Sequence, residues 1–272
     1  MKVDGSGLQS MASGWRRWRG KASQHTLFVQ HGGVWDWAPT SQGRSVDAAP
    51  EHHHTLGAWV ESHPGQRARL ILSSQLLHHL VLNESRLPLH DETAISDYAR
   101  HQFTHYHGSV AQGWPLAVWD DDRQRGVCAL HGLDLSELLA QAVRCKVRFS
   151  SMTPWWAVAL RAAQRQDPGL GRAPQAGLLL AEGQLLTCLT LGHGRLLNIE
   201  QRRLDEASLA AANDGAREWQ AELAERADIG LTLTGYGLSV ASTQPGALAP
   251  LRVLGDVDLL ESARPHLQWV LA

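Results

Sequence analysis

Cysteine and long apolar runs are both scarce in this sequence. The three cysteines, Cys128, Cys145 and Cys188, each lie in a short apolar stretch and form no CxxC pair. Buried thiols in a reducing compartment fit this pattern better than a disulfide framework or a zinc site. No apolar run approaches the roughly 18 to 20 residues of a membrane-spanning helix, and residues 1–13 lack a signal-peptide core. The sequence therefore predicts a soluble, cytoplasmic protein.

Several motifs of enzymes and nucleotide-binding proteins are also absent. The chain has no Walker A motif, no G-x-G-x-x-G after an expected strand and no G-x-S-x-G nucleophile elbow. Charged residues make up only 19% and the net charge is -2, so no global field attracts nucleic acid. Hydrophobic residues make up 43% of 272 residues, which is enough to bury the core of one large domain or two lobes.

Tryptophan is present in excess, with eleven residues against three phenylalanines. Its large ring and N–H group favour half-buried positions and interfaces. Trp155 and Trp156 are adjacent at the start of an expected helix and point to different sides, so we do not expect both to be buried in one core. With Trp114 and Trp119, they are our predicted partner contacts.

Turn residues and apolar periodicity predict a mixed order of strands and helices. Residues 1–24 form a flexible tail with a basic-aromatic patch at Trp15–Lys21, which is a disordered arm, a non-native addition or a weak headgroup contact. A polar loop is expected through His52–His54. Helices are expected at 56–62, 91–106, 135–144, 155–166 and 206–226. Strands are expected at 25–30, 34–37, 68–74, 76–82, 114–119, 125–130, 146–150, 176–181, 184–191, 195–200, 231–236 and 251–254.

Two stretches carry a family resemblance. In the first, an expected strand ends in Leu72-Ser73, a second strand follows, and the next helix carries Arg100-His101-Gln102-Phe103. In the second, Gly132 to Trp156, strand and helix alternate twice. Both resemble the PilM, GspL and MshI group of actin-like proteins, which scaffold type IV pilus and type II secretion platforms. The resemblance implies an α/β, degenerate actin-like (ribonuclease H-like) fold of two lobes, residues 25–150 and a second, truncated lobe at 151–272.

The sequence departs from that family's ATPases at the phosphate-binding turns. Actin-like ATPases use an Asp-x-Gly turn in each lobe, whose backbone N–H groups cradle phosphate while the Asp organises the metal. Here the first turn reads His31-Gly32-Gly33 and the second reads Ala181-Glu182-Gly183, followed by Gly192-His193-Gly194. We therefore expect degenerate turns at Gly32, Gly33, Glu182 and Gly183, a pseudo-ATPase without catalytic residues, and no cofactor or metal.

The resemblance also implies a role and partners. It predicts a cytoplasmic scaffold at the inner face of the bacterial inner membrane that does not turn over nucleotide. Its partners would be the short cytoplasmic tail of an inner-membrane assembly protein and a secretion or pilus motor ATPase, with no nucleic acid. Strand or groove docking suits such a tail. Membrane association would come only through partners or residues 1–24.

A hydrolase or metal-dependent enzyme that uses the histidine-rich first lobe is the alternative. His101, His105 and His107 suggest a metal site, because positions four apart on a helix, such as 101 and 105, share one face. His78, His79 or the run at 52–54 could complete a metal shell. Against this, no carboxylate or cysteine has a recognised zinc-motif spacing, and fifteen histidines make chance proximity common. The acidic run at 120–122 lacks the ligands of a calcium loop and predicts a solvated turn.

Overall fold

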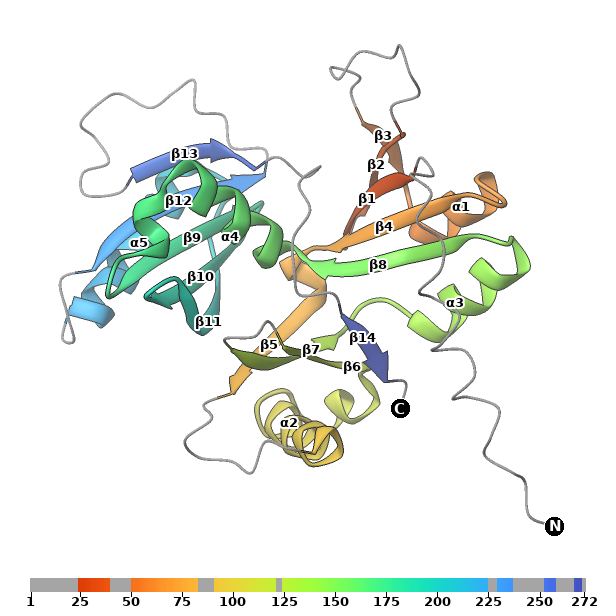
Figure 1. Ribbon diagram of the computed structural model, residues 1–272, viewed down its shortest axis with the longest axis horizontal. Coiled ribbons are helices and arrows are strands. Elements are labelled where there is room, and N and C mark those ends of the chain that lie inside the picture. The colour runs from red at the N-terminus through yellow and green to blue at the C-terminus, as the bar shows by residue number, and fades with distance from the viewer. Residues whose placement is uncertain are drawn as a thin grey trace.

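The computed structural model describes residues 24–39, 50–82, 91–120, 124–224, 229–236, 252–257 and 267–270. Within them the chain forms three mixed or antiparallel sheets and five α-helices, as Figure 1 shows. The predicted tail lies almost wholly outside the described residues, as do Asp121 and Asp122 of the acidic run. None of the described helices is both long and apolar enough to span a membrane.

The first sheet contains the N-terminal hairpin and two parallel strands. Its order is β3 (Glu51–His53), β2 (Gly33–Trp37), β1 (His25–Gln30), β4 (Arg67–Leu72) and β8 (Arg148–Pro154). β1 pairs antiparallel with β2 and parallel with β4, which pairs parallel with β8. Helices α1 (Leu56–Ser62) and α3 (Leu135–Arg144) begin where the side chains of Thr55 and Asp134 accept a backbone N–H hydrogen bond.

The second sheet is the predicted meander extended by two parallel strands. Its order is β11 (Arg195–Arg203), β10 (Leu185–Gly192), β9 (Ala176–Glu182), β12 (Gly230–Tyr236) and β13 (Arg252–Asp256). β9 is buried along its whole length, as expected for a central strand covered on both faces. Helix α5 (Leu209–Ala224) covers one face, where Trp219 packs in a cluster with Leu231 and Leu186.

The third sheet lies below the other two in Figure 1 and is covered by helix α2 (Glu92–His107). Its order is β14 (Gln268–Val270), β6 (Leu116–Asp120), β7 (Arg125–Leu130) and β5 (Leu77–Leu82). Short 3₁₀ segments precede β5 at Ser74–Leu76 and β6 at Ser109–Gly113, and a third lies at Pro168–Gly171. β14 pairs antiparallel with β6, so residues close to the C-terminus join this sheet.

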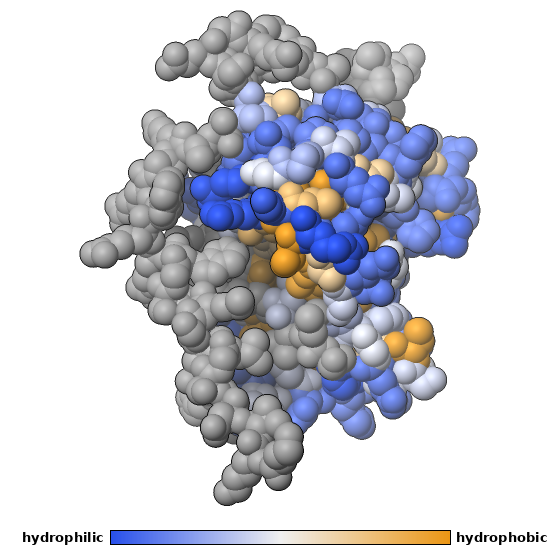
Figure 2. Space-filling model, turned by 90° about the vertical axis from the view of Figure 1, so that its right-hand side faces the viewer, coloured by the Kyte–Doolittle hydropathy of each residue, from blue (hydrophilic) through white to orange (hydrophobic). Residues whose placement is uncertain are grey.

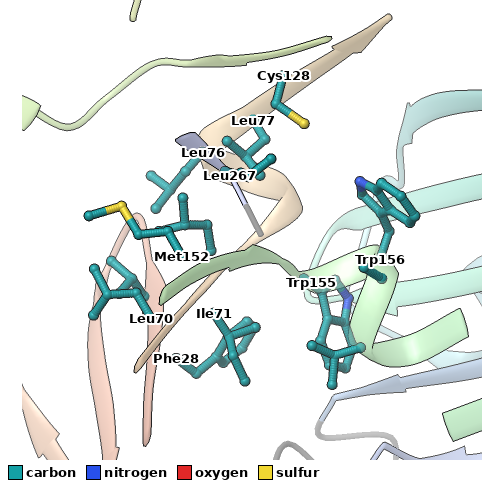
Figure 3. Close-up of a cluster of buried hydrophobic side chains, with 14 of the residues drawn as sticks. Phe28, Leu70, Ile71, Leu76, Leu77, Cys128, Met152, Trp155, Trp156 and Leu267 are labelled. Carbon is teal, nitrogen blue, oxygen red and sulfur yellow. The ribbon is translucent and has the colours of Figure 1, made fainter. Parts of the chain in front are cut away.

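One hydrophobic cluster connects all three sheets (Figure 3). Helix α4 (Trp155–Gln166) lies at its centre, where the Trp155 ring packs 5.4 Å from Phe28 of β1 and the Trp156 ring packs 5.3 Å from Trp119 of β6. The cluster also contains Leu178 of β9 and Leu267 next to β14. The core is therefore continuous from the N-terminal hairpin to the meander.

The structure corrects several expectations. Residues 51–53 are an edge strand and not part of a loop, because β2 supplies backbone partners for a polar segment. The strand expected at 146–150 is instead β8 at 148–154, since Ser151–Pro154 pair with β4. Helix α5 begins at Leu209 and not at 206, because the Ser208 hydroxyl accepts a hydrogen bond from the Ala211 N–H and caps the helix there. β14 was not predicted. Trp155 and Trp156 are both buried in the same core, which contradicts our expectation.

Candidate functional site

The two glycine turns identified in the sequence both close predicted hairpins. The β1–β2 turn holds His31 and Gly32 on the surface, and Gly33 follows with a φ of 150°. The β9–β10 turn holds Gly183 with a φ of 59°, a conformation that L-residues with a side chain rarely adopt. Gly192 and Gly194 flank His193 in the next turn, where His193 has a φ of 51° and Gly194 of 73°.

Glu182 lies at the end of β9 and is 1% exposed. Its Oε1 accepts hydrogen bonds from the Ser73 hydroxyl and from Gln30 Nε2 (3.3 Å), and its Oε2 accepts one from the Ser74 N–H (3.1 Å). Gln75 Nε2 donates to the Glu182 carbonyl oxygen at 3.3 Å. The carboxylate therefore joins the ends of β9, β1 and β4, three strands that are far apart in the sequence.

Burial and hydrogen bonding act in opposite directions on this carboxyl group. Burial raises the pKa of Glu182, while the hydrogen bonds from Ser73, Ser74 and Gln30 lower it, and burial has the larger effect. The three donors are neutral, so no described cation neutralises the ionised form. Both oxygens of the Glu182 carboxylate thus accept hydrogen bonds from groups of the protein itself, which hold the side chain between the strand ends.

Other contacts also stabilise this junction, where the ends of β9, β1 and β4 meet. Gln201 of β11 donates from Nε2 to the carbonyl oxygens of Ser74 (2.7 Å) and Leu77 (3.0 Å). The His31 ring lies beside Gly132, because a methyl group added there would be 3.5 Å from His31 Nδ1. Both turns thus approach the segment Ser73–Leu77.

The histidines predicted as an alternative metal site separate into different surroundings. His78 of β5 stacks on His107 of α2 (ring centroids 4.0 Å apart) and on His131 (4.3 Å). His101 and His105 are exposed on the outer face of α2. Burial, with the nearby His131 and His107, lowers the pKa of His78 to about 4. Burial, with the neighbouring His78 and His131, lowers the pKa of His79 to about 3.

The four tryptophans predicted as partner contacts differ in accessibility. Trp119, Trp155 and Trp156 are buried, so they present no surface to a partner in this conformation. Trp114 is half-buried and packs its ring 5.0 Å from that of His78.

Seen from the right-hand side of Figure 1, the surface is mainly hydrophilic, with hydrophobic residues gathered near its middle (Figure 2).

Sequence reasoning missed a second polar cluster. His25, Asp36 and His63 lie together under helix α1, with His25 Nδ1 2.9 Å from both carboxylate oxygens of Asp36. The register of the predicted hairpin could have indicated this cluster. Leu27 pairs with Asp36, so His25, two residues before Leu27, lies on the same face of the sheet as Asp36.

The cysteines are free. Cys128 and Cys188 are buried as predicted, whereas Cys145 is half-buried at the C-terminal end of α3. Burial raises the pKa of Cys188 to about 12 and raises that of Cys128 as well. The ordinary pKa of a thiol is about 8.5, so both remain protonated at neutral pH.

Comparisons with known proteins show an actin-like fold. A protein of unknown function with an actin-like ATPase fold from Bacteroides thetaiotaomicron has a TM-score of 0.55 at 12% identity, over 86% of this chain and 92% of that one. The cytoplasmic domain of EpsL, an inner-membrane component of the Vibrio cholerae type II secretion system, has a TM-score of 0.50 at 11% identity, over 88% and 92%.

A PilM–PilN type IV pilus biogenesis complex also matches, with a TM-score of 0.49 at 11% identity, over 88% of this chain and 89% of that one. No protein-family model and no curated protein matches the sequence. At these identities the likeness is one of fold, and it confirms the mixed α/β, actin-like architecture expected from the sequence.

Proposed function

We propose that this protein is a scaffold subunit of a bacterial inner-membrane assembly platform of the type II secretion or type IV pilus kind. It binds the cytoplasmic tail of a membrane partner, with a motor ATPase as a further partner, and does not turn over nucleotide. It lies at the inner face of the inner membrane and is recruited there by partners or by residues 1–24. We also propose a division into two lobes at residues 25–150 and 151–272.

The hydrogen bonding of Glu182 is the observation that carries this proposal. In an actin-like ATPase, the resemblance implies an aspartate at this turn that organises a nucleotide-bound metal. Here the longer Glu182 side chain accepts from Gln30, Ser73 and Ser74. A group used in this way supports the connection between strands and not phosphate chemistry. The EpsL domain, which shares the fold, is named as part of a secretion system and supports the same reading.

Nucleotide binding is the direct test of the first half of the proposal. We expect isothermal titration with MgATP to give no binding heat up to millimolar nucleotide, and we expect no phosphate release in a coupled assay. Glu218→Ala, at an exposed position on α5, serves as the matched control for Glu182→Ala. Micromolar binding or turnover that Glu182→Ala abolishes and Glu218→Ala preserves would overturn the proposal.

Partner binding tests the second half. The protein is crosslinked in its native host, and we expect an inner-membrane protein with a single span to be recovered with it. A synthetic peptide of that protein's cytoplasmic tail should bind the purified chain in solution. Trp114→Ala should weaken this binding at least about tenfold if Trp114 is a contact, since aromatic anchors carry much of an interface's energy. Tyr106→Ala, at a residue 73% exposed, is the control. Absence of peptide binding refutes the scaffold role.

A further inference from the structure

The cluster under helix α1 consists of metal-ligand side chains from three elements. The ligand atoms of His25 (β1), Asp36 (β2) and His63, the residue that caps the C-terminus of α1, all lie within 4.8 Å of one another. His25 Nδ1 is 2.9 Å from Asp36 Oδ1, and His63 Nε2 is 3.9 Å from Asp36 Oδ2. The side chains are 10%, 2% and 22% exposed respectively, so the cluster is enclosed.

Sheet register explains why these residues meet. Asp36 pairs with Leu27 of β1 and with Glu51 of β3, and Val34 pairs with His53. Directly paired residues and residues two apart share a face of a sheet. His25, Asp36, Glu51 and His53 therefore all lie on the face that α1 covers, which is an unusual concentration of ligand types on one small surface.

The hydrogen bonds of His63 leave one ring nitrogen facing a carboxylate. His63 Nδ1 lies 3.0 Å from the Trp59 carbonyl oxygen. The Ser62 hydroxyl also lies 2.9 Å from Nδ1, and it can donate its own proton to the carbonyl oxygen of Ala58 or Trp59. Because a carbonyl only accepts, the contact with Trp59 favours the ring proton on Nδ1. In the neutral ring Nε2 then carries a lone pair and faces Asp36 Oδ2, which is a second acceptor. Two acceptors 3.9 Å apart are placed to share a bound metal ion.

His53 lies next to the cluster but outside the three residues whose ligand atoms are all within 4.8 Å of one another. Its ring centroid lies 5.5 Å from that of His63, and its Nε2 is buried without a hydrogen-bond partner among the described residues. Glu51 Oε1 lies 3.7 Å from this Nε2. A buried imidazole nitrogen without a partner is costly in a folded protein unless an unseen group satisfies it.

We infer that His25, Asp36 and His63 form a structural binding site for a divalent transition-metal ion, with zinc as the ion that fits best and with His53 as the fourth ligand after a shift of its side chain toward the other three. Imidazole nitrogens favour zinc over the oxygen-preferring calcium and magnesium. Tetrahedral zinc with bonds of about 2.0–2.1 Å has ligand atoms about 3.3 Å apart, and the two distances of 2.9 and 3.9 Å bracket this value.

Trp59 supplies the outer contacts that such a site requires. Its Nε1 donates to Asp36 Oδ2 at 2.8 Å, and its carbonyl oxygen accepts from His63 Nδ1. Its ring also stacks on that of His63, with centroids 4.6 Å apart. Metal-binding histidines commonly donate their second N–H to a backbone carbonyl, which fixes the tautomer and orients the lone pair. The bound ion would tie β1 and β2 to α1.

Metal binding must displace a proton from this cluster. Without the ion, His25 donates Nδ1–H to Asp36, and this proton must move to Nε2 or to solvent before Nδ1 can bind metal. Protons compete with the ion for the imidazole lone pairs, so we expect Zn²⁺ affinity to fall as the pH is lowered.

Zinc titration of the chelator-treated full chain tests this inference. We expect the wild type to bind one Zn²⁺ per chain in competition with a chelator, and Co²⁺ to give the strong visible absorption of a four-coordinate site. Excess Mg²⁺ and Ca²⁺ should not compete. His63→Ala and Asp36→Asn should each weaken Zn²⁺ binding at least about tenfold. The double variant His101→Ala, His105→Ala, which removes two exposed histidines of α2, should bind as the wild type does.

Asp36→Asn keeps the side-chain volume and an acceptor for Trp59 Nε1, so it reports on the ligand even if His63→Ala fails to fold by circular dichroism. The inference is overturned if the folded wild type binds no stoichiometric Zn²⁺. It is also overturned if Asp36→Asn binds Zn²⁺ as tightly as the wild type, or if binding is lost only when His78 and His131 are changed to Gln.

Discussion

A carboxylate that is 1% exposed must find hydrogen-bond donors, because an unpaired charge in the interior costs far more than one hydrogen bond contributes. Glu182 finds them in Gln30, Ser73 and Ser74. These donors all belong to the protein itself, so the Glu182 carboxylate helps to fix the geometry with which the strand ends meet. Its turn resembles the phosphate-binding turn of actin-like ATPases, whereas its contacts are structural.

Removal of the Glu182 side chain should destabilise the protein. Glu182→Ala leaves the Ser74 N–H and the Ser73 hydroxyl without their acceptor, and each unsatisfied buried group costs about 1–3 kcal/mol. We expect the free energy of unfolding in urea at pH 7 to fall by about 3 kcal/mol. Glu182→Gln, which keeps one acceptor, should lose less.

The control for this prediction is Glu218→Ala at an exposed position, which should change stability by less than about 0.5 kcal/mol. Equal stability of Glu182→Ala and Glu218→Ala would mean that the hydrogen bonds at the junction contribute nothing.

The sequence identified this turn and its glutamate but none of the donors. Ser73 and Ser74 are separated from Glu182 by 109 and 108 residues, and no local pattern relates them. The tryptophan pair was misjudged for a related reason. Opposite sides of a helix are both buried when sheets pack on each, and α4 lies inside a core shared by all three sheets.

At the scale of elements, helices and long strands were predictable and short edge strands were not. All five helices carry apolar periodicity or capping residues, and Asp91 and Asp134 cap α2 and α3 through their side chains. β3 and β14 have three residues each and bond through the backbone to β2 and β6. Three residues are too few for a hydrophobic alternation to appear.

The stacked histidines of β5, α2 and the loop after β7 make stability depend on pH. The pKa of His78 is lowered to about 4 from 6.5 by burial and by His131 and His107, while Gln201 of β11 opposes this through a hydrogen bond. Below pH 6.5 the unfolded chain therefore binds more protons here than the folded one. Stability falls as the pH drops from about 6.5 towards about 4.

Urea unfolding of the wild type, His78→Gln and His101→Gln between pH 7 and pH 5 measures this effect. The slope of unfolding free energy against pH gives the number of protons taken up on unfolding. His78→Gln should lower this number by a fraction of one proton, whereas His101→Gln, at an exposed position on α2, should leave it unchanged. Parallel curves for the wild type and His78→Gln would show that the stacked ring does not remain neutral on folding.

For the whole molecule, the fold class was predictable from the order of elements and the family resemblance, and the comparisons bear it out. The path of the chain near its C-terminus was not predictable. The Leu267 N–H donates to the Met152 carbonyl oxygen at 2.7 Å, and β14 then pairs with β6 in the sheet that lies between residues 77 and 130. The lobes proposed from sequence position, 25–150 and 151–272, therefore do not account for β14, which belongs to the second range but joins a sheet of the first.

The continuous core has a consequence for unfolding. Phe28, Trp155 and Leu178 belong to one hydrophobic cluster, although they come from the N-terminal hairpin, α4 and the meander. Contacts that span the proposed lobes, such as those of Gln201 with Ser74 and Leu77, strengthen this coupling. Neither lobe could unfold without exposing apolar surface of the other. We therefore expect tryptophan fluorescence and far-ultraviolet circular dichroism to report the same urea midpoint.

Chains of this size often unfold in stages, so coincidence of the two probes is informative. Gln201→Ala removes a connection between the proposed lobes, and it should move both midpoints together to lower urea. Arg203→Ala, on the same strand but exposed, serves as its control. Two separate transitions in the wild type would instead mean that residues 25–150 and 151–272 are independent folding units that merely touch, and the shared cluster around Trp155 would then contribute little to their coupling.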